Sequence, residues 1–162
     1  MIQVEDKNTT LISDKLRLIP FRSKDDYDYL LRIAKAHTLF PYSDSQADEL
    51  FNKYCKYAWV GYVNGRQSGV VYLGYYEAHD IWTLSGFGDK EGLKGVKNRI
   101  GYMEKACNLA MDYAFQNFTN MIYAFHDKRN KSVVRVFKRL GFKYCQDHTS
   151  DGCVFELYLR MK

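Results

Sequence analysis

Apolar and polar residues alternate over several segments of the chain, a pattern typical of strands with one buried face. Residues 15–21 alternate in this way and predict a strand, which Pro20 confines to a sheet edge or a strand end. The same period returns over residues 57–76, where Asn64 and Gly65 predict a tight hairpin turn because both accept positive φ. We therefore expect this segment to form two antiparallel strands.

The period of two continues into the second half of the chain. Residues 81–88 predict a third strand of this run, in which Gly86 and Gly88 indicate a bulge or a close approach of another group to the backbone. A short apolar run at residues 121–127 predicts a further strand, and residues 142–161 predict a closing hairpin. The turn of this hairpin is expected at Ser150-Asp151-Gly152.

Four segments instead repeat apolar residues every three or four positions and predict helices. The first two cover residues 23–37, capped by the serine at its start, and residues 44–56. The third and longest covers residues 98–117, and the fourth begins at Asn130 as N-cap and ends at Gly141. The buried stripe of the third helix is predicted to be Met103, Ala106, Cys107, Ala110 and Ala114.

The elements follow the order β α α β β β α β α β β, which predicts an α/β (α+β) fold with a mixed sheet and helices on its faces. The strand, helix and strand of the second half imply a right-handed crossover and at least one parallel pair. At 162 residues the chain has the length of one domain. We assign that domain to residues 15–162 and interpret residues 1–14, which are polar and unpatterned, as an N-terminal arm.

Composition and charge narrow the classes of function. The net charge of +5 favours an anionic ligand but lacks the dense basic stripe of a dedicated nucleic-acid binder. No apolar stretch is long enough to span a bilayer and no signal sequence opens the chain, so we expect a cytoplasmic protein. The cysteines lack C-x-x-C spacing, which favours buried thiols over disulfides or zinc ligands, and no metal site is predicted. They are Cys55, Cys107, Cys145 and Cys153.

A polar, glycine-containing stretch at residues 89–97 leads into the longest predicted helix. Such a loop directs backbone N–H groups and the positive end of the helix dipole at one spot, which suits a phosphate. Lys90, Lys94, Lys97 and Arg99 add positive charge nearby. Neither a Walker-type P-loop nor the Rossmann glycine pattern is present, so these residues alone leave open an anion site or a flexible charged loop.

Two stretches, "RIGYMEKACNLAMDYAF" at residues 99–115 and "NKSVVRVFKRLGF" at residues 130–142, carry a resemblance to a known family. Together with the element order they resemble the GNAT superfamily of acyl-CoA N-acyltransferases, especially the branch that contains the ribosomal-protein N-terminal acetyltransferases. The resemblance extends from about Leu16 to the C-terminus. It implies a mostly antiparallel central sheet of about seven strands with four helices. It also implies an enzyme that moves an acetyl group from acetyl-CoA to a primary amine of a protein N-terminus, a lysine or a small molecule.

The resemblance further implies roles for individual residues. The family's pyrophosphate signature falls on residues 98–103, where Gly101 is kept and lets the cofactor approach the backbone. Asn130 matches the asparagine that contacts the pantetheine arm, and Arg135 or Lys138 is expected to reach the nucleotide phosphate. The implied coenzyme A contacts are Phe87, Gly88, Lys97, Asn98, Arg99, Ile100, Gly101, Tyr102, Met103, Asn130, Ser132, Arg135, Phe137 and Lys138.

Direct attack by an amine requires a base, donors for the developing oxyanion and an acid for the departing thiolate. Backbone N–H groups of residues 85–88 are expected to bind the oxyanion. Many family members carry a tyrosine acid where this chain has Phe137, so Tyr102, Tyr144 or solvent is expected to take that role. The candidate bases are Asp89, which we prefer, and Glu91, His79, His126 and Glu77.

Two alternatives remain open. A catalytically inactive interaction module is suggested by Asn98, where the family commonly has glutamine or arginine, by a longer loop before Gly101 and by Phe137. A nucleic-acid-modifying transferase is suggested by the basic face of the fourth helix and by fourteen tyrosines, and we favour it less. The expected partners are acetyl-CoA and an amine acceptor, without a membrane, in a monomer or homodimer.

Overall fold

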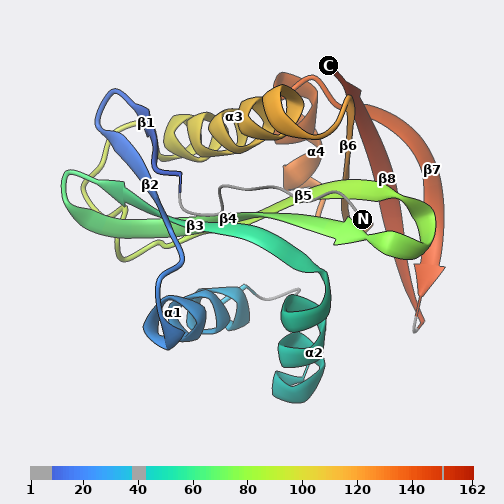
Figure 1. Cartoon of the computed structure of the whole chain (residues 1–162), viewed down its shortest axis with the longest axis horizontal. Coiled ribbons are helices and arrows are strands. Elements are labelled where there is room, and N and C mark those ends of the chain that lie inside the picture. The colour runs from blue at the N-terminus through green and yellow to red at the C-terminus, as the bar shows by residue number, and fades with distance from the viewer. Residues whose placement is uncertain (1–8, 38–42, 151) are drawn as a thin grey trace.

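The computed structural model describes residues 9–37, 43–150 and 152–162. They form one eight-stranded sheet with two helices on each face (Figure 1). The strand order is β1-β2-β3-β4-β5-β6-β8-β7, and only the β5–β6 pair is parallel. The predicted mixed, mostly antiparallel sheet with four helices is therefore confirmed, with one strand more than expected.

The additional strand is β1 (Leu11–Ser13), which lies in the segment interpreted as an arm and pairs with β2 (Leu16–Pro20). Three residues are too few to show an alternating pattern, so this strand was not predicted. Because β1 pairs only with residues 16–18, Pro20 has a strand neighbour on one side, at Trp59. Of the two predicted places for Pro20, the strand end is confirmed. The edge strand is β1 rather than β2. Residues 1–8 of the predicted arm lie outside the described residues.

The predicted hairpin is formed by β3 (Cys55–Val63) and β4 (Arg66–Tyr76), with φ of 52° at Asn64 and 76° at Gly65. A short 3-10 helix, η1 (Glu77–His79), connects β4 to β5 (Ile81–Gly88). β4 and β5 pair without a shift of register, so β5 has no bulge.

The second interpretation, a close approach to the backbone, holds at Gly86, where a Cβ would lie 3.0 Å from the Val70 carbonyl oxygen of β4. A Cβ at Gly86 would lie 3.8 Å from Met103, and one at Gly88 would lie 3.5 Å from it. The distances to Met103 are those of ordinary contact. The side chain of Met103 therefore points into the sheet.

One face of β3, β4 and β5 is covered by α1 (Lys24–Lys35) and α2 (Asp44–Tyr54), both of which begin where the sequence predicts. Ser43 and Gln46 form a reciprocal capping box at the start of α2. Ser23 is the N-cap of α1 but makes no side-chain cap bond. The break expected between the two helices falls mostly on residues 38–42, which lie outside the described residues.

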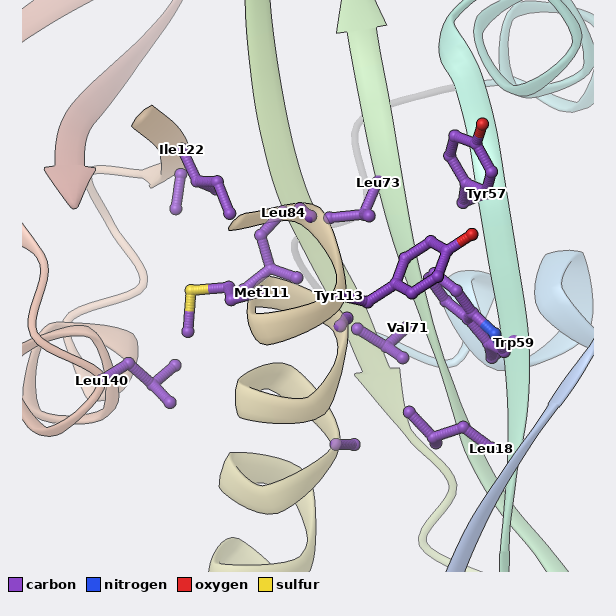
Figure 2. Packing of buried hydrophobic residues seen from close by; sticks show 14 of the residues in the cluster. Leu18, Tyr57, Trp59, Val71, Leu73, Leu84, Met111, Tyr113, Ile122 and Leu140 are labelled. Carbon is purple, nitrogen blue, oxygen red and sulfur yellow. The ribbon is translucent and has the colours of Figure 1, made fainter. Parts of the chain in front are cut away.

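The other face of the sheet carries α3 (Arg99–Asn117), whose buried side chains form the main core (Figure 2). The three alanines of the predicted stripe are buried, whereas Met103 and Cys107 are half-buried. Met111, Tyr113 and Phe115 are also buried, and the sequence analysis missed them. The buried face is wider than one stripe because α3 packs against more than the sheet. Figure 2 shows Met111 beside Ile122 of β6 and Leu140 at the end of α4.

The chain ends with β6 (Met121–Asp127), α4 (Ser132–Arg139), β7 (Lys143–Ser150) and β8 (Cys153–Met161). The N-cap of α4 is Lys131, so the prediction of Asn130 as N-cap is wrong. Asn130 instead belongs to the turn after β6, where its N–H donates to the Asp127 carbonyl at 2.8 Å. The predicted closing hairpin is formed by β7 and β8, and Asp151 of its turn lies outside the described residues.

The predicted end of α4 is confirmed. Gly141 has φ of 85°, and its N–H donates to the Lys138 carbonyl at 3.1 Å. The Phe142 N–H donates to the Phe137 carbonyl at 2.9 Å, which completes a Schellman motif.

The four cysteines form no disulfide. Burial raises the pKa of Cys55 and of Cys107 to about 12, so these two thiols stay protonated at neutral pH. The prediction of a buried thiol is wrong for Cys145, which is exposed on the edge strand β7. Among the described residues, no helix combines the length and the apolar character needed to cross a membrane.

Candidate active site

The parallel strands β5 and β6 separate toward their carboxyl ends. They share one registered pair, Thr83 with Tyr123, and both then continue, β5 to Gly88 and β6 to Asp127. Beyond Thr83, β5 keeps β4 as its neighbour but has no registered partner on the β6 side. Ligands of open α/β sheets bind outside the carboxyl ends of parallel strands, which makes this opening the candidate site.

Each strand of the opening leads into a helix: β5 continues through residues 89–98 into α3, and β6 continues through residues 128–131 into α4. The first N–H groups of each helix have no acceptor within the helix, and the positive end of its dipole lies there. At α4 the N-cap residue, Lys131, provides no side-chain acceptor for these groups. Both helix starts therefore suit the phosphates of a ligand.

The start of α3 is partly occupied by its own N-cap. Asn98 adopts the left-handed conformation at φ 57°, and its Oδ1 accepts the Gly101 N–H at 3.2 Å. A Cβ at Gly101 would lie 2.3 to 2.8 Å from the Asn98 amide group, so this amide fills the space in front of the glycine. Asn98, Arg99 and Ile100 are exposed, and the Asn98 side chain can therefore rotate into solvent and release the N–H. After that single rotation, the Gly101 N–H and the space in front of it can accommodate a phosphate.

The turn between β6 and α4 is fixed by a buried carboxylate. Asp127 accepts bonds from Nε and Nη2 of Arg129 at 2.9 and 2.6 Å and from its N–H at 2.9 Å. These bonds lower the pKa of Asp127 to about 2. Within the same turn Asn130 Oδ1 accepts the Ser132 hydroxyl at 2.8 Å, which leaves the Asn130 amide hydrogens directed away from that bond. Arg135 and Lys138 are exposed on α4.

The preferred base, Asp89, ties the end of β5 to two other segments. Its Oδ2 accepts the Tyr29 hydroxyl of α1 at 2.7 Å, and its Oδ1 accepts the Glu91 N–H at 3.0 Å. Burial and this carboxylate raise the pKa of Tyr29, so the phenol keeps its proton. The Asp89 N–H donates to the carbonyl of Ser68 at 2.9 Å. Tyr29 was not among the predicted site residues, because its contact with Asp89 joins residues sixty positions apart and leaves no local pattern.

The three predicted catalytic side chains are not brought together. Asp89 lies at the end of β5, whereas Tyr102 lines a groove beside the β3–β4 hairpin. Tyr144 lies on the edge strand β7, where its hydroxyl donates to Asp147 at 2.9 Å, and β8 separates β7 from β6. Glu77 and His79 precede the first residue of β5, so the structure places them at the end of the strand opposite the opening.

His126, another candidate base, is buried behind α4 with 6% of its surface exposed. Its Nδ1 lies 2.7 Å from the Asp127 carbonyl and must donate to it, which leaves Nε2 as the acceptor in the neutral ring. Nε2 is buried without a hydrogen-bond partner among the described residues, and the nearest charged group is Glu156 Oε2 at 3.7 Å. The ring packs against Phe137 with centroids 5.6 Å apart. An acceptor amine at the surface does not reach this nitrogen.

A family model and several solved structures match the chain. The family model described as "Acetyltransferase (GNAT) domain" matches residues 15–143. No curated protein matches the chain.

Solved structures share the fold at low sequence identity. The acetyltransferase from Agrobacterium tumefaciens strain C58 is 17% identical with a TM-score of 0.70, over 100% of this chain and 99% of that chain. The ribosomal L7/L12 alpha-N-protein acetyltransferase RimL, in complex with coenzyme A, is 16% identical with a TM-score of 0.68, over 94% and 98%. The spermidine/spermine N-acetyltransferase SpeG from Vibrio cholerae is 17% identical with a TM-score of 0.68, over 91% and 94%. With a family model that covers most of its length, this chain belongs to the GNAT family of acetyltransferases.

Proposed function

We propose that this protein transfers an acetyl group from acetyl-CoA to a primary amine by direct attack of the amine on the thioester. The observation that carries the proposal is the separation of β5 and β6 after Thr83 and Tyr123, with the starts of α3 and α4 beyond it. The opening offers an unpaired strand edge for the acyl group beside two groups of helix N–H donors for phosphates.

The cofactor's diphosphate is proposed to lie against the start of α3. The N–H groups of Arg99 and Ile100 are the first of the helix, and the Gly101 N–H joins them once Asn98 rotates away. At the start of α4, Asn130 is proposed to contact the pantetheine arm, and Ser132, Arg135 and Lys138 lie on the same helix. Three of the predicted cofactor contacts lie elsewhere: Met103 packs into the sheet, and Lys97 and Tyr102 line the groove beside the hairpin.

The acyl oxygen is proposed to bind the open edge of β5. Successive residues of a strand direct their N–H groups to opposite sides, so alternate residues between Ser85 and Gly88 present an N–H on the side away from β4. Phe87 and Gly88, both implied as cofactor contacts, belong to this edge. Backbone donors held by a sheet need no reorganisation when charge develops on the oxygen, which is the condition for strong stabilisation.

Proton removal from the amine is proposed to involve Asp89, directly or through a water molecule. Both of its oxygens already accept hydrogen bonds, so the carboxylate is oriented but has limited capacity for a further proton. For the departing thiolate, neither Tyr102 nor Tyr144 lies beside the opening, and Phe137 has no proton to donate. Protonation by solvent is therefore the proposed fate of the thiolate.

The acceptor is proposed to be a protein N-terminus, a lysine or a small monoamine. RimL and SpeG, which share the fold, are named for a protein alpha-amine and for polyamines. The net charge of +5 on this chain opposes the approach of a polycation, so a polyamine is the less favoured of these acceptors.

A thiol-release assay with purified protein, acetyl-CoA and a panel of amines tests the proposal. The panel contains short peptides with free or blocked N-termini, an N-blocked lysine peptide, a monoamine and spermidine. We expect thiol release above the hydrolysis rate with at least one free amine, and mass spectrometry should find its acetylated product. Blocking the reactive amine must abolish the signal. Saturable acetyl-CoA binding without turnover on any amine would overturn the catalytic proposal.

That outcome is what the rival function predicts. Three observations favour a non-catalytic module that binds a cofactor or a partner. The Asn98 side chain caps the Gly101 N–H, two hydrogen bonds occupy the Asp89 carboxylate, and Phe137 has no proton to donate. The two functions differ in turnover, because the module binds but releases no thiol.

A further inference from the structure

A basic groove lies at the end of the sheet where three turns meet. The turns themselves, those of β1–β2 and β3–β4 and the segment that leads into α3, lie at the left of Figure 1. The β1–β2 turn, the β3–β4 hairpin and residues 94–97 enclose a volume of about 420 Å³ that is open to solvent. Its polar lining comes from Lys15, Asn64, Arg66, Lys94, Lys97 and Tyr102.

The charged residues that line this groove are all positive. Four of its lining residues are lysine or arginine, and none is aspartate or glutamate. The nearest carboxylate in sequence, Asp14, already pairs with Lys105 at 3.0 Å. Like charges around one concavity repel each other and attract anions, because the low-dielectric walls focus their field. The groove therefore gains most from a ligand with several negative charges close together.

The wall formed by residues 89–98 is held in place by specific contacts. Arg66 donates from Nη2 to the Glu91 carbonyl at 2.9 Å and from Nη1 to the Lys94 carbonyl at 3.3 Å. Leu93 is buried in the core, and Gly92 lies so close to β4 that a Cβ there would stand 1.7 Å from the Gln67 carbonyl oxygen. A wall ordered in advance loses little conformational entropy when a ligand binds.

The groove and the cofactor opening lie on different sides of the start of α3. Tyr102 faces the groove, and Lys105, one turn later, reaches Asp14 between β1 and β2. On another side of the same turns, Glu104 accepts a bond from Arg139 at the end of α4. The groove is therefore separate from the β5–β6 opening and from the basic residues of α4.

We propose that this groove binds a small molecule that carries two or more adjacent phosphate groups, at a site distinct from the cofactor. Lysine ammonium groups act as point charges for phosphate oxygens, and the Asn64 amide and Tyr102 hydroxyl add neutral donors. The volume lies within the range of small-ligand sites, and three turns enclose it. Both features favour a compact polyphosphate over a long nucleic-acid strand.

Calorimetric titration of the full chain with inorganic tripolyphosphate at low ionic strength tests this proposal, with inorganic sulfate as the single-group comparison. We expect one saturable site that binds tripolyphosphate at least about tenfold more tightly than sulfate. The variant Lys15→Gln/Lys94→Gln should weaken tripolyphosphate binding by about tenfold.

The matched control is Arg135→Gln/Lys138→Gln, which removes the same charge from α4. We expect it to change tripolyphosphate affinity by less than about twofold, because salt screens charges that lie away from the groove. Absence of saturable binding would overturn the proposal, and so would equal weakening by both double variants, which would indicate the cofactor site or a general charge effect. Affinity that rises with the length of an oligonucleotide would assign the groove to nucleic acid instead.

Discussion

Asn98 and Gly101 compete for the same space at the start of α3. The Asn98 amide caps the Gly101 N–H in the structure, and the proposed cofactor phosphate needs that N–H and the space in front of it. In the proposed function, the Asn98 amide therefore occupies the position of the anion until the cofactor binds. Alanine has the better helix propensity, but its Cβ at position 101 would overlap the Asn98 amide, which accounts for the glycine.

Gly101→Ala should separate the capping role from the cofactor role. The added Cβ displaces the Asn98 amide, and we expect the lost cap to outweigh the better helix propensity by about 0.5 to 1 kcal/mol of unfolding free energy. The same Cβ obstructs phosphate approach, so we expect CoA affinity to fall by about tenfold or more. Urea unfolding and calorimetric CoA titration measure the two effects.

The control is Asn98→Gly/Gly101→Ala, in which the glycine at position 98 still accepts φ 57°. We expect this variant to be at least as stable as Asn98→Gly, because no side chain clashes with the new Cβ. Its CoA affinity should remain low. Full recovery of CoA affinity in the double variant would show that phosphate does not approach at Gly101.

Asp127 makes the stability of the protein depend on pH. Its pKa is lowered from 3.8 to about 2 by Arg129, so its contribution to stability is complete above about pH 4 and is lost as the pH falls through 2. Asp127→Asn should lower the unfolding free energy at neutral pH by about 2 kcal/mol, because three hydrogen bonds to a charged group are weakened. Urea unfolding of both proteins between pH 5 and pH 2 measures the difference, which should shrink toward acid. A difference that stays constant with pH would contradict the assignment.

The loop between β5 and α3 is the element whose structure the sequence predicted least. Its glycines and polar residues predicted a turn-rich anion loop, but they could not distinguish the roles of Gly92 and Gly95. Position 92 requires glycine because of a contact with Gln67 of β4, twenty-five positions away in the sequence. Position 95 requires glycine because of the local backbone alone: its φ is 78°, and no atom lies within 4 Å of its Cβ position.

Gly92→Ala and Gly95→Ala test that difference. We expect Gly95→Ala to cost about 1 kcal/mol, because alanine is strained in the left-handed region. Gly92→Ala should cost about 3 kcal/mol and should release the contacts between the loop and Arg66, because its Cβ overlaps a carbonyl oxygen. Thermal unfolding compares the two variants. Equal costs would show that the loop can move away from β4 freely.

The predictions for helices and hairpins depended on local signals, and they succeeded where the local signal decides the structure. Asn64 with Gly65, and Gly141, fix their elements through their own φ values. Asn130 failed as a predicted N-cap because its backbone is held in the turn after β6 by the Asp127 carbonyl. Strand β1 was missed because only pairing with β2 defines it.

For the molecule as a whole, function depends on a sheet that is packed on both faces yet open between two strands. One core lies between the sheet and α3, and a second lies under α1 and α2. The strand patterns of residues 81–88 and 121–127 gave no sign that β5 and β6 separate, because alternation reports burial rather than pairing. The expectation from the sequence was only that backbone N–H groups of residues 85–88 bind the oxyanion. The separation of the two strands, and the contacts of Asp89 with Tyr29 and of His126 with Glu156, became visible only in the fold.

Met111→Ala tests the core that holds α3 over the opening. Met111 is fully buried beside Ile122 and Leu140 (Figure 2), so the variant leaves a cavity and should cost about 2 to 5 kcal/mol of unfolding free energy. The matched control is Met161→Ala, at a side chain that is 58% exposed, and it should cost less than about 0.5 kcal/mol. Urea unfolding measures both. Similar costs for the two variants would contradict the packing described for α3.

Amide hydrogen exchange with and without saturating CoA is the most direct test of the central claim, that main-chain donors at two helix starts bind the cofactor. We predict that CoA slows exchange in the peptides that cover residues 98–103 and 131–135, and leaves the edge strand β7 unchanged. Saturable CoA binding without protection of residues 98–103 would contradict the claim, and so would the absence of any CoA binding at millimolar concentration.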